Sequence, residues 1–63
     1  MDLIIELGLA FNHSAQVEDT LKNFHNAYLL YHHAYFLARK YLGFSNILTY
    51  HFDTFLKKFI QQL

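Results

Sequence analysis

The side chains that could do chemistry in this 63-residue chain are its histidines, carboxylates and amines. The sequence contains five histidines and five acidic residues, but no cysteine. The lack of cysteine excludes a thiolate nucleophile, a disulfide bond and a cysteine-based zinc site. Metal binding or acid–base catalysis would therefore require histidines and carboxylates at spacings that bring them together.

The histidines are poorly spaced for a metal site. His25 and His32 lie seven residues apart, which places them on one face of a helix. A zinc site on a single helix needs ligands three or four residues apart, as in the HExxH motif, and no such pair occurs. Two copies of the chain could bring four histidines together, and this alternative stays open. We predict no bound metal and no cofactor, with the histidines packed at the edge of an interface.

The carboxylates form no catalytic pattern. A nucleophile, a base and an orienting acid do not occur together at recognisable spacings. Helix caps and solvated ion pairs explain the acidic residues, and Asp53 lies four residues before Lys57, a favourable helical pair. We therefore predict that the protein is not an enzyme. The acidic residues are Asp2, Glu6, Glu18, Asp19 and Asp53.

The charge balance argues against nucleic acid and membranes as partners. Five basic residues offset the five acidic ones, whereas nucleic-acid binding calls for a basic face. No apolar run reaches the roughly 18 to 20 residues of a membrane span, and the chain opens with Asp2 rather than a cationic segment. We predict a cytoplasmic protein without membrane contact, and the alternative function is a small dimeric DNA-associated regulator.

The chain is predicted to be one all-α domain over residues 1–63, beginning with a short helix over about 2–12. Leu3, Leu7 and Ala10 recur at helical spacing. Asp2 is a suitable N-cap for this helix. Alternate residues in this segment are also apolar, as in a strand, but no second strand is evident to pair with it. Helix is therefore the favoured interpretation.

A long central helix over about 14–42 and a C-terminal helix are predicted to follow. Ser14 is the expected N-cap of the central helix, and Gly43 is its expected stop. Ser45 is the expected cap of the third helix. The predicted fold is thus a short helix, a long helix and a C-terminal helix packed as a helical hairpin or three-helix unit within a homodimer.

The predicted central helix carries a regular apolar seam. Apolar residues recur at alternating intervals of four and three, the heptad spacing of packed helices. Hydrophobic residues make up 54% of the chain, more than so small a body buries by itself, so we predict that the seam is a homodimer interface. The seam consists of Val17, Leu21, Phe24, Tyr28, Tyr31, Tyr35, Ala38 and Leu42.

The row of residues beside the seam indicates how two copies could pair. An antiparallel copy would set Glu18 opposite Arg39 and His25 opposite His32. Such a two-fold contact is self-complementary, as homodimer interfaces commonly are. The alternative is that the seam packs on the chain's own third helix. The flanking residues are Glu18, His25, His32 and Arg39.

The chain as a whole resembles the small, cysteine-free helical early proteins of temperate, lambda-like bacteriophages. The resemblance covers all 63 residues through their overall character and carries over no functional residue. It implies an accessory factor that modulates phage development or host physiology through protein contacts in the host cytoplasm. The resulting prediction is a non-enzymatic, homo-oligomeric protein-interaction module that binds itself and another protein.

Overall fold

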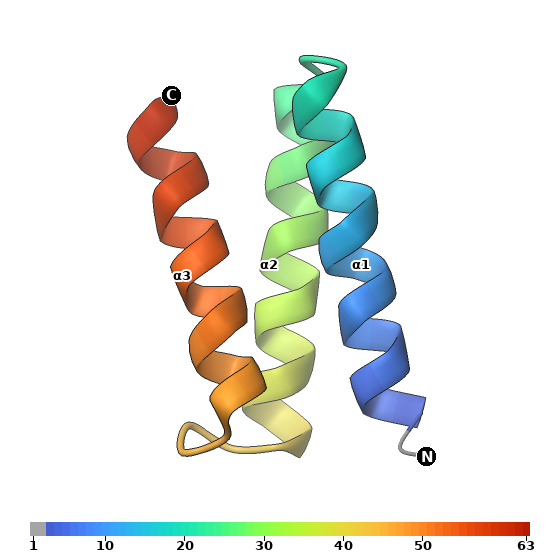
Figure 1. Cartoon of the computed structure of the whole chain (residues 1–63), viewed down its shortest axis with the longest axis vertical. Coiled ribbons are helices and arrows are strands. Elements are labelled where there is room, and N and C mark those ends of the chain that lie inside the picture. The colour runs from blue at the N-terminus through green and yellow to red at the C-terminus, as the bar shows by residue number, and fades with distance from the viewer. Residues whose placement is uncertain (1–2) are drawn as a thin grey trace.

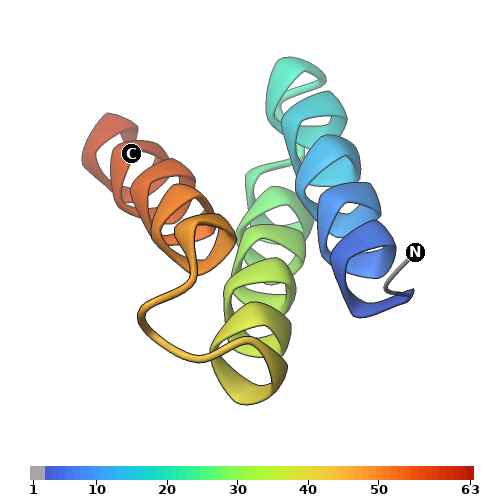
Figure 2. The same cartoon turned by 60° about the horizontal axis from the view of Figure 1, so that its bottom comes forward.

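The computed structural model describes residues 3–63, which form three helices joined by two short turns (Figure 1). The helices are α1 (Leu3–Thr20), α2 (Phe24–Tyr41) and α3 (Ile47–Gln62). They run alternately up and down, with α2 between the other two (Figure 2). The described residues contain no strand, so the all-α prediction is confirmed. Asp2, the expected first cap, lies outside the described residues.

The predicted boundary between the first two helices is wrong. Ser14 does not cap a helix, because α1 continues through it to Thr20. The central helix begins at Phe24 instead of Ser14. The predicted short first helix and long central helix are therefore replaced by helices of 18, 18 and 16 residues.

A left-handed turn at Lys22 ends α1. Lys22 has a φ of 64°, and its N–H donates to the Asp19 carbonyl at 3.0 Å. The Asn23 N–H donates to the Glu18 carbonyl at 2.9 Å, which completes the hydrogen-bond pair of a Schellman motif. The Asn23 side chain also donates to the Glu18 carboxylate at 2.8 Å. Glycine usually occupies the left-handed position, so a lysine there provided no stop signal in the sequence.

Small residues explain why the chain folds back at this turn. Ala15 of α1 and Ala27 of α2 are fully buried in one cluster. In a continuous helix these two residues would lie roughly 18 Å apart along the axis and could not share a core. Folding back brings them together, and their small side chains allow the two helices to approach closely. Gly8 of α1 and Ala34 of α2 are buried as well.

The second turn follows the sequence prediction closely. Gly43 ends α2 as predicted, with a φ of 84°. The cap of α3 is Asn46 instead of the predicted Ser45, because the Asn46 side chain is the one that accepts the Leu48 N–H, at 2.9 Å. The buried Thr49 hydroxyl donates to the Gly43 carbonyl at 2.8 Å. This hydrogen bond fastens the turn to the first residues of α3.

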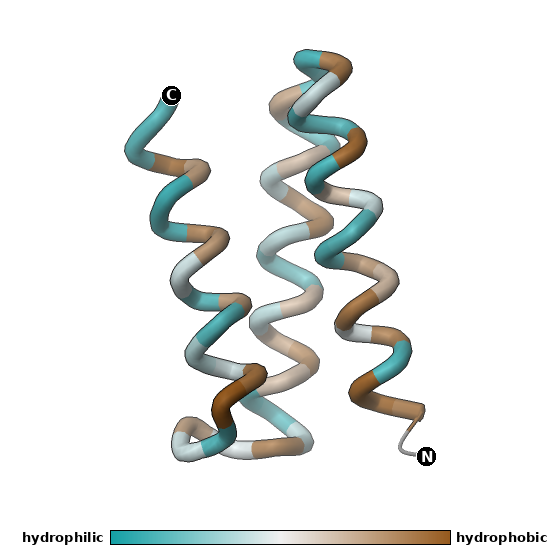
Figure 3. The backbone as a smooth tube through the Cα atoms, in the orientation of Figure 1, coloured by the Kyte–Doolittle hydropathy of each residue, from teal (hydrophilic) through white to brown (hydrophobic). Residues whose placement is uncertain are grey.

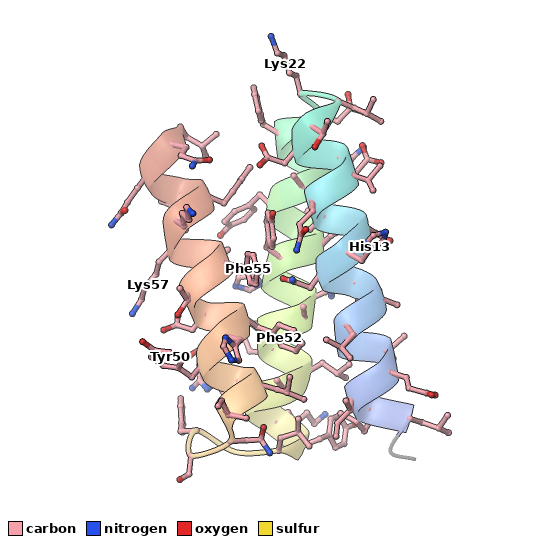
Figure 4. The ribbon with its side chains drawn as sticks, viewed as in Figure 1. His13, Lys22, Tyr50, Phe52, Phe55 and Lys57 are labelled. Atoms are coloured by element: carbon pink, nitrogen blue, oxygen red, sulfur yellow. The ribbon has the colours of Figure 1, made fainter. Side chains whose placement is uncertain are left out.

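Helix α3 is amphipathic and packs its aromatic side on α2. Phe52, Leu56 and Phe59 are buried. Figure 4 shows Phe52 and Phe55 projecting towards α2, whereas Tyr50 and Lys57 project to the other side. Hydrophilic and hydrophobic stretches alternate along the α3 backbone, as expected for a helix with one wet side (Figure 3). The predicted helical pair is confirmed, with Lys57 Nζ 3.0 Å from Asp53 Oδ2.

Helices α1 and α3 approach each other at Gly8. A Cβ atom on Gly8 would lie 2.9 Å from Cε2 of the buried Phe52 ring, closer than packed carbon atoms come. Glycine at this position therefore makes room for Phe52.

The turn at Lys22 can be tested by whether a glycine substitution raises or lowers the free energy of unfolding. Lys22→Gly should raise the free energy of unfolding by about 1 kcal/mol, because glycine adopts a left-handed backbone without steric cost. Lys58→Gly, the same substitution inside α3, should lower it by about 0.5 to 1 kcal/mol. Urea denaturation followed by circular dichroism measures both. A continuous helix over 14–42 would make both variants destabilised.

The Gly8 contact predicts an energetic coupling between α1 and α3. Gly8→Ala should destabilise the protein by about 1 kcal/mol, because displacing the Phe52 ring costs more than the alanine gains in helix propensity. In a Phe52→Leu background, where the ring is gone, Gly8→Ala should be neutral or stabilising. A double-mutant cycle from urea denaturation measures the coupling. Equal effects in both backgrounds would contradict the contact.

Candidate functional site

The turn after α1 divides the predicted seam between two helices. The predicted antiparallel pairing requires one helix from Val17 to Leu42, and the structure has a turn at Lys22 instead. That register is therefore wrong. The exposed members of the seam are Val17, Leu21, Phe24 and Tyr28; the half-buried ones are Tyr35 and Leu42; the buried ones are Tyr31 and Ala38.

The buried members of the seam pack on the chain's own α3. The Tyr31 ring lies 5.2 Å from the Phe59 ring and 6.4 Å from the Phe55 ring, between centroids. Ala38 shares a core cluster with Phe52. The alternative that the sequence left open, packing on the third helix, thus applies to this half of the seam. A second copy could not reach Tyr31 or Ala38 without displacing α3.

The four residues predicted to flank the seam are likewise divided between α1 and α2. Glu18 belongs to α1 and accepts the Asn23 side chain. The other three belong to α2, where His25 is exposed and His32 lies 4.7 Å from the Phe36 ring, between centroids. The Arg39 guanidinium lies 4.9 Å from the centroid of the Phe44 ring, a cation–π contact. These three α2 side chains share a face that neither neighbouring helix covers.

A cleft of about 290 Å³ lies between the C-terminal halves of α1 and α3. Its floor consists of the Tyr31, Phe55 and Phe59 rings, which come from α2 and α3. Its walls are polar, with amide, hydroxyl, carboxylate and amine groups. The wall residues are Gln16, Asp19 and Thr20 of α1 with Lys58 and Gln62 of α3.

Tyr31 is the titratable group at the floor of this cleft. Burial raises the pKa of its hydroxyl above the usual value, and the nearby Asp19 carboxylate raises that pKa further. The hydroxyl is therefore a neutral hydrogen-bond donor at physiological pH and not a base. Within residues 3–63, no three histidine or carboxylate side chains gather into a group that could hold a metal ion.

A second groove, of about 240 Å³, lies between α1 and α2. The Phe11 ring of α1 contacts the His33 ring of α2, with 5.8 Å between centroids. Phe36 and Lys40 complete the part of the groove that opens on the exposed side of α2. Sequence reasoning missed Phe11, His33 and Phe36, because they lie outside the seam and only the α1–α2 packing brings them together.

Asn12 is a second feature that the sequence did not indicate. Its side chain is buried among the small residues of α1, and its Oδ1 has no hydrogen-bond partner. An unpaired buried polar atom costs about 1 to 3 kcal/mol. The packing of α1 is therefore less stable than its burial alone would suggest.

No protein-family model, curated protein or solved structure matches this chain. The predicted resemblance to bacteriophage early proteins and the alternative of a DNA-associated regulator therefore stay predictions. No helix within residues 3–63 combines the length and apolar character needed to cross a lipid bilayer.

The raised pKa of Tyr31 predicts a loss of stability at high pH. The unfolded chain releases the phenol proton near pH 10, whereas the folded protein retains it to higher pH. Stability is therefore unaffected below about pH 10 and falls above it. Tyr31→Phe should show a smaller fall than wild type between pH 9 and pH 11 in urea denaturation. Tyr41→Phe, at an exposed tyrosine, is the control and should behave as wild type.

Proposed function

We propose that the protein is a non-enzymatic, self-associating interaction module whose contact surface is the outer side of α1. The observation that carries the proposal is a row of exposed apolar side chains on this helix and at Leu21, the residue that directly follows it. Leu3, Leu7, Val17 and Leu21 are 76%, 45%, 47% and 63% exposed. Large apolar side chains that remain exposed at regular spacing mark interaction surfaces.

The row has the spacing of a helix–helix interface. Leu3, Leu7, Ala10, Ser14, Val17 and Leu21 follow one another at intervals of four and three residues. This heptad spacing keeps them along one side of the helix. The buried residues of α1, namely Gly8, Asn12 and Ala15, lie on another side, where Ala15 shares a core cluster with Ala27 of α2 and Gly8 faces Phe52 of α3. We call the exposed row the α1 stripe.

The α1 stripe is compatible with an antiparallel copy of itself. A two-fold axis beside Asn12 would pair Leu3 with Leu21 and Leu7 with Val17 of the second copy. The central layer would pair Ala10 with Ser14, two small residues that allow close approach of the helices. The proposal thus keeps Val17 and Leu21 of the predicted seam in a homodimer, with α1 in place of α2 as the contacting helix.

The proposal is tested by placing a charge in the stripe. Leu7→Glu should weaken the dimer at least tenfold in dissociation constant, because a carboxylate would be buried between apolar side chains. Sedimentation equilibrium over a range of protein concentrations measures the monomer–dimer equilibrium. Leu7 is already 45% exposed, so the monomer should remain folded.

Leu29→Glu is the matched control, because Leu29 is a leucine of similar exposure, 41%, in the middle of α2. It should leave the dissociation constant within twofold of wild type. A dimer lost in Leu29→Glu and retained in Leu7→Glu would place the interface on α2 and refute the proposal. A wild-type protein that is monomeric at millimolar concentration would also refute the proposal.

A further inference from the structure

The charged residues of the chain are segregated, although the total charge is balanced. Helix α2 contains three of the five histidines together with Arg39 and Lys40. It contains no aspartate or glutamate. A chain with a formal net charge of zero therefore has one helix whose charged side chains are all cationic and which also carries three histidines.

These side chains form two rows along the exposed side of α2. Residues seven apart nearly superpose on a helix. One row is His25, His32 and Arg39, and the other is Asn26, His33 and Lys40. Leu29 and Phe36, which are both exposed, lie between the two rows and form an apolar ridge. We call this surface the α2 outer face.

Ring contacts hold the α2 outer face in place. The His32 ring stacks on Tyr28 at 5.7 Å and meets Phe36 edge-on at 4.7 Å, between centroids. The Arg39 guanidinium lies 5.8 Å from the Phe36 ring centroid and 4.9 Å from that of Phe44. The cationic row is thus packed beside the apolar ridge along most of the helix.

The neighbouring helices add little negative charge to this face. From α1, the Phe11 ring contacts His33, and the Glu18 carboxylate is engaged by the Asn23 side chain at the N-terminal end of α2. The other α1 carboxylates are Asp19, which lines the cleft between α1 and α3, and Glu6, which is exposed in the first turn of the helix. From α3, Asp53 is paired with Lys57. Histidine side chains gain a proton between about pH 8 and pH 5. Three of the five basic side chains on the face are histidines, so its positive charge is expected to rise on acidification.

The balanced total charge predicted no membrane contact, but the segregated charge of α2 points the other way. We infer that the α2 outer face docks on an anionic phospholipid surface, and that it does so more strongly at pH 5.5 than at pH 7.5. Cations that flank an exposed apolar ridge are the arrangement of helices that lie in a membrane interface. The cationic rows meet the lipid phosphates, and Leu29 and Phe36 enter the boundary between headgroups and acyl chains.

A second copy of the chain and a nucleic acid fit the α2 outer face less well than a phospholipid surface does. A second copy of the face would bring like charges together, and the repulsion would grow on acidification. A nucleic acid could stack on the aromatic rings, but Leu29 at the centre of the ridge offers it neither stacking nor charge. The docking surface is separate from the α1 stripe, so the inference does not depend on self-association.

Vesicle flotation tests the inference. Wild-type protein should bind vesicles of equal parts phosphatidylglycerol and phosphatidylcholine at least tenfold more strongly at pH 5.5 than at pH 7.5. It should not bind pure phosphatidylcholine vesicles at either pH. Raising the salt concentration should weaken the binding, because the attraction is electrostatic.

Two sets of variants separate the α2 outer face from the rest of the chain. The triple variant His25→Gln, His32→Gln, His33→Gln should lose the pH dependence. The double variant His13→Gln, His51→Gln should keep it, because these exposed histidines lie on α1 and α3. Phe36→Ser and, independently, Leu29→Gln should weaken binding at pH 5.5 at least fivefold. Circular dichroism checks that each variant is folded.

Four results would overturn the inference. They are the absence of binding to anionic vesicles at pH 5.5, equal binding to pure phosphatidylcholine, pH dependence that survives in the triple variant, and loss of pH dependence in the double variant. Binding to a DNA fragment at pH 5.5 without binding to vesicles would assign the face to nucleic acid and would also refute the lipid surface. The monomeric Leu7→Glu protein should bind vesicles as well, which distinguishes this inference from the proposed dimer.

Discussion

The close packing of α1 on α2 is the interaction on which the rest of the structure depends. It is built from small residues, with Ala15 on one helix and Ala27 and Ala34 on the other, all buried. Small side chains contribute little hydrophobic area each, but they let two helix backbones approach closely and exclude water along their length. The left-handed Lys22 and the unpaired amide oxygen of Asn12 both oppose this packing. The chain retains both because the burial along two 18-residue helices outweighs them.

Helix α3 stabilises the structure by a different kind of packing. Its buried rings, Phe52 and Phe59, cover α2 beside Tyr31, and Gly8 admits Phe52 between α1 and α3. Large rings keep α3 at a distance from its neighbours, whereas small residues let α1 and α2 approach closely. The polar-walled cleft between the C-terminal halves of α1 and α3 follows from this difference.

The same packing decides which side chains are left for partners. A chain of this size has too much apolar material to bury, and α2 is covered from two sides. Part of the surplus therefore appears on the outer side of α1 and on the outer face of α2, and part at the α2–α3 turn and on α3. The first surface is uncharged and mostly apolar and suits another helix, whereas the second is bordered by cationic side chains and suits an anionic surface. Because the two surfaces lie on different helices, both could be engaged in one molecule.

The sequence by itself determined the features that depend on neighbours along the chain. Helical spacing, the stop at Gly43 and the pair of Asp53 with Lys57 are local, so they could be predicted without knowing the fold. Even the misplaced cap at Ser45 differs from the true cap, Asn46, by one residue. The tertiary structure alone decided the turn at Lys22. A left-handed lysine costs roughly 1 kcal/mol and gives no local signal, and only the burial of residues distant in sequence makes that turn favourable. The division of the seam, the cleft and the exposed side of α2 all follow from that turn.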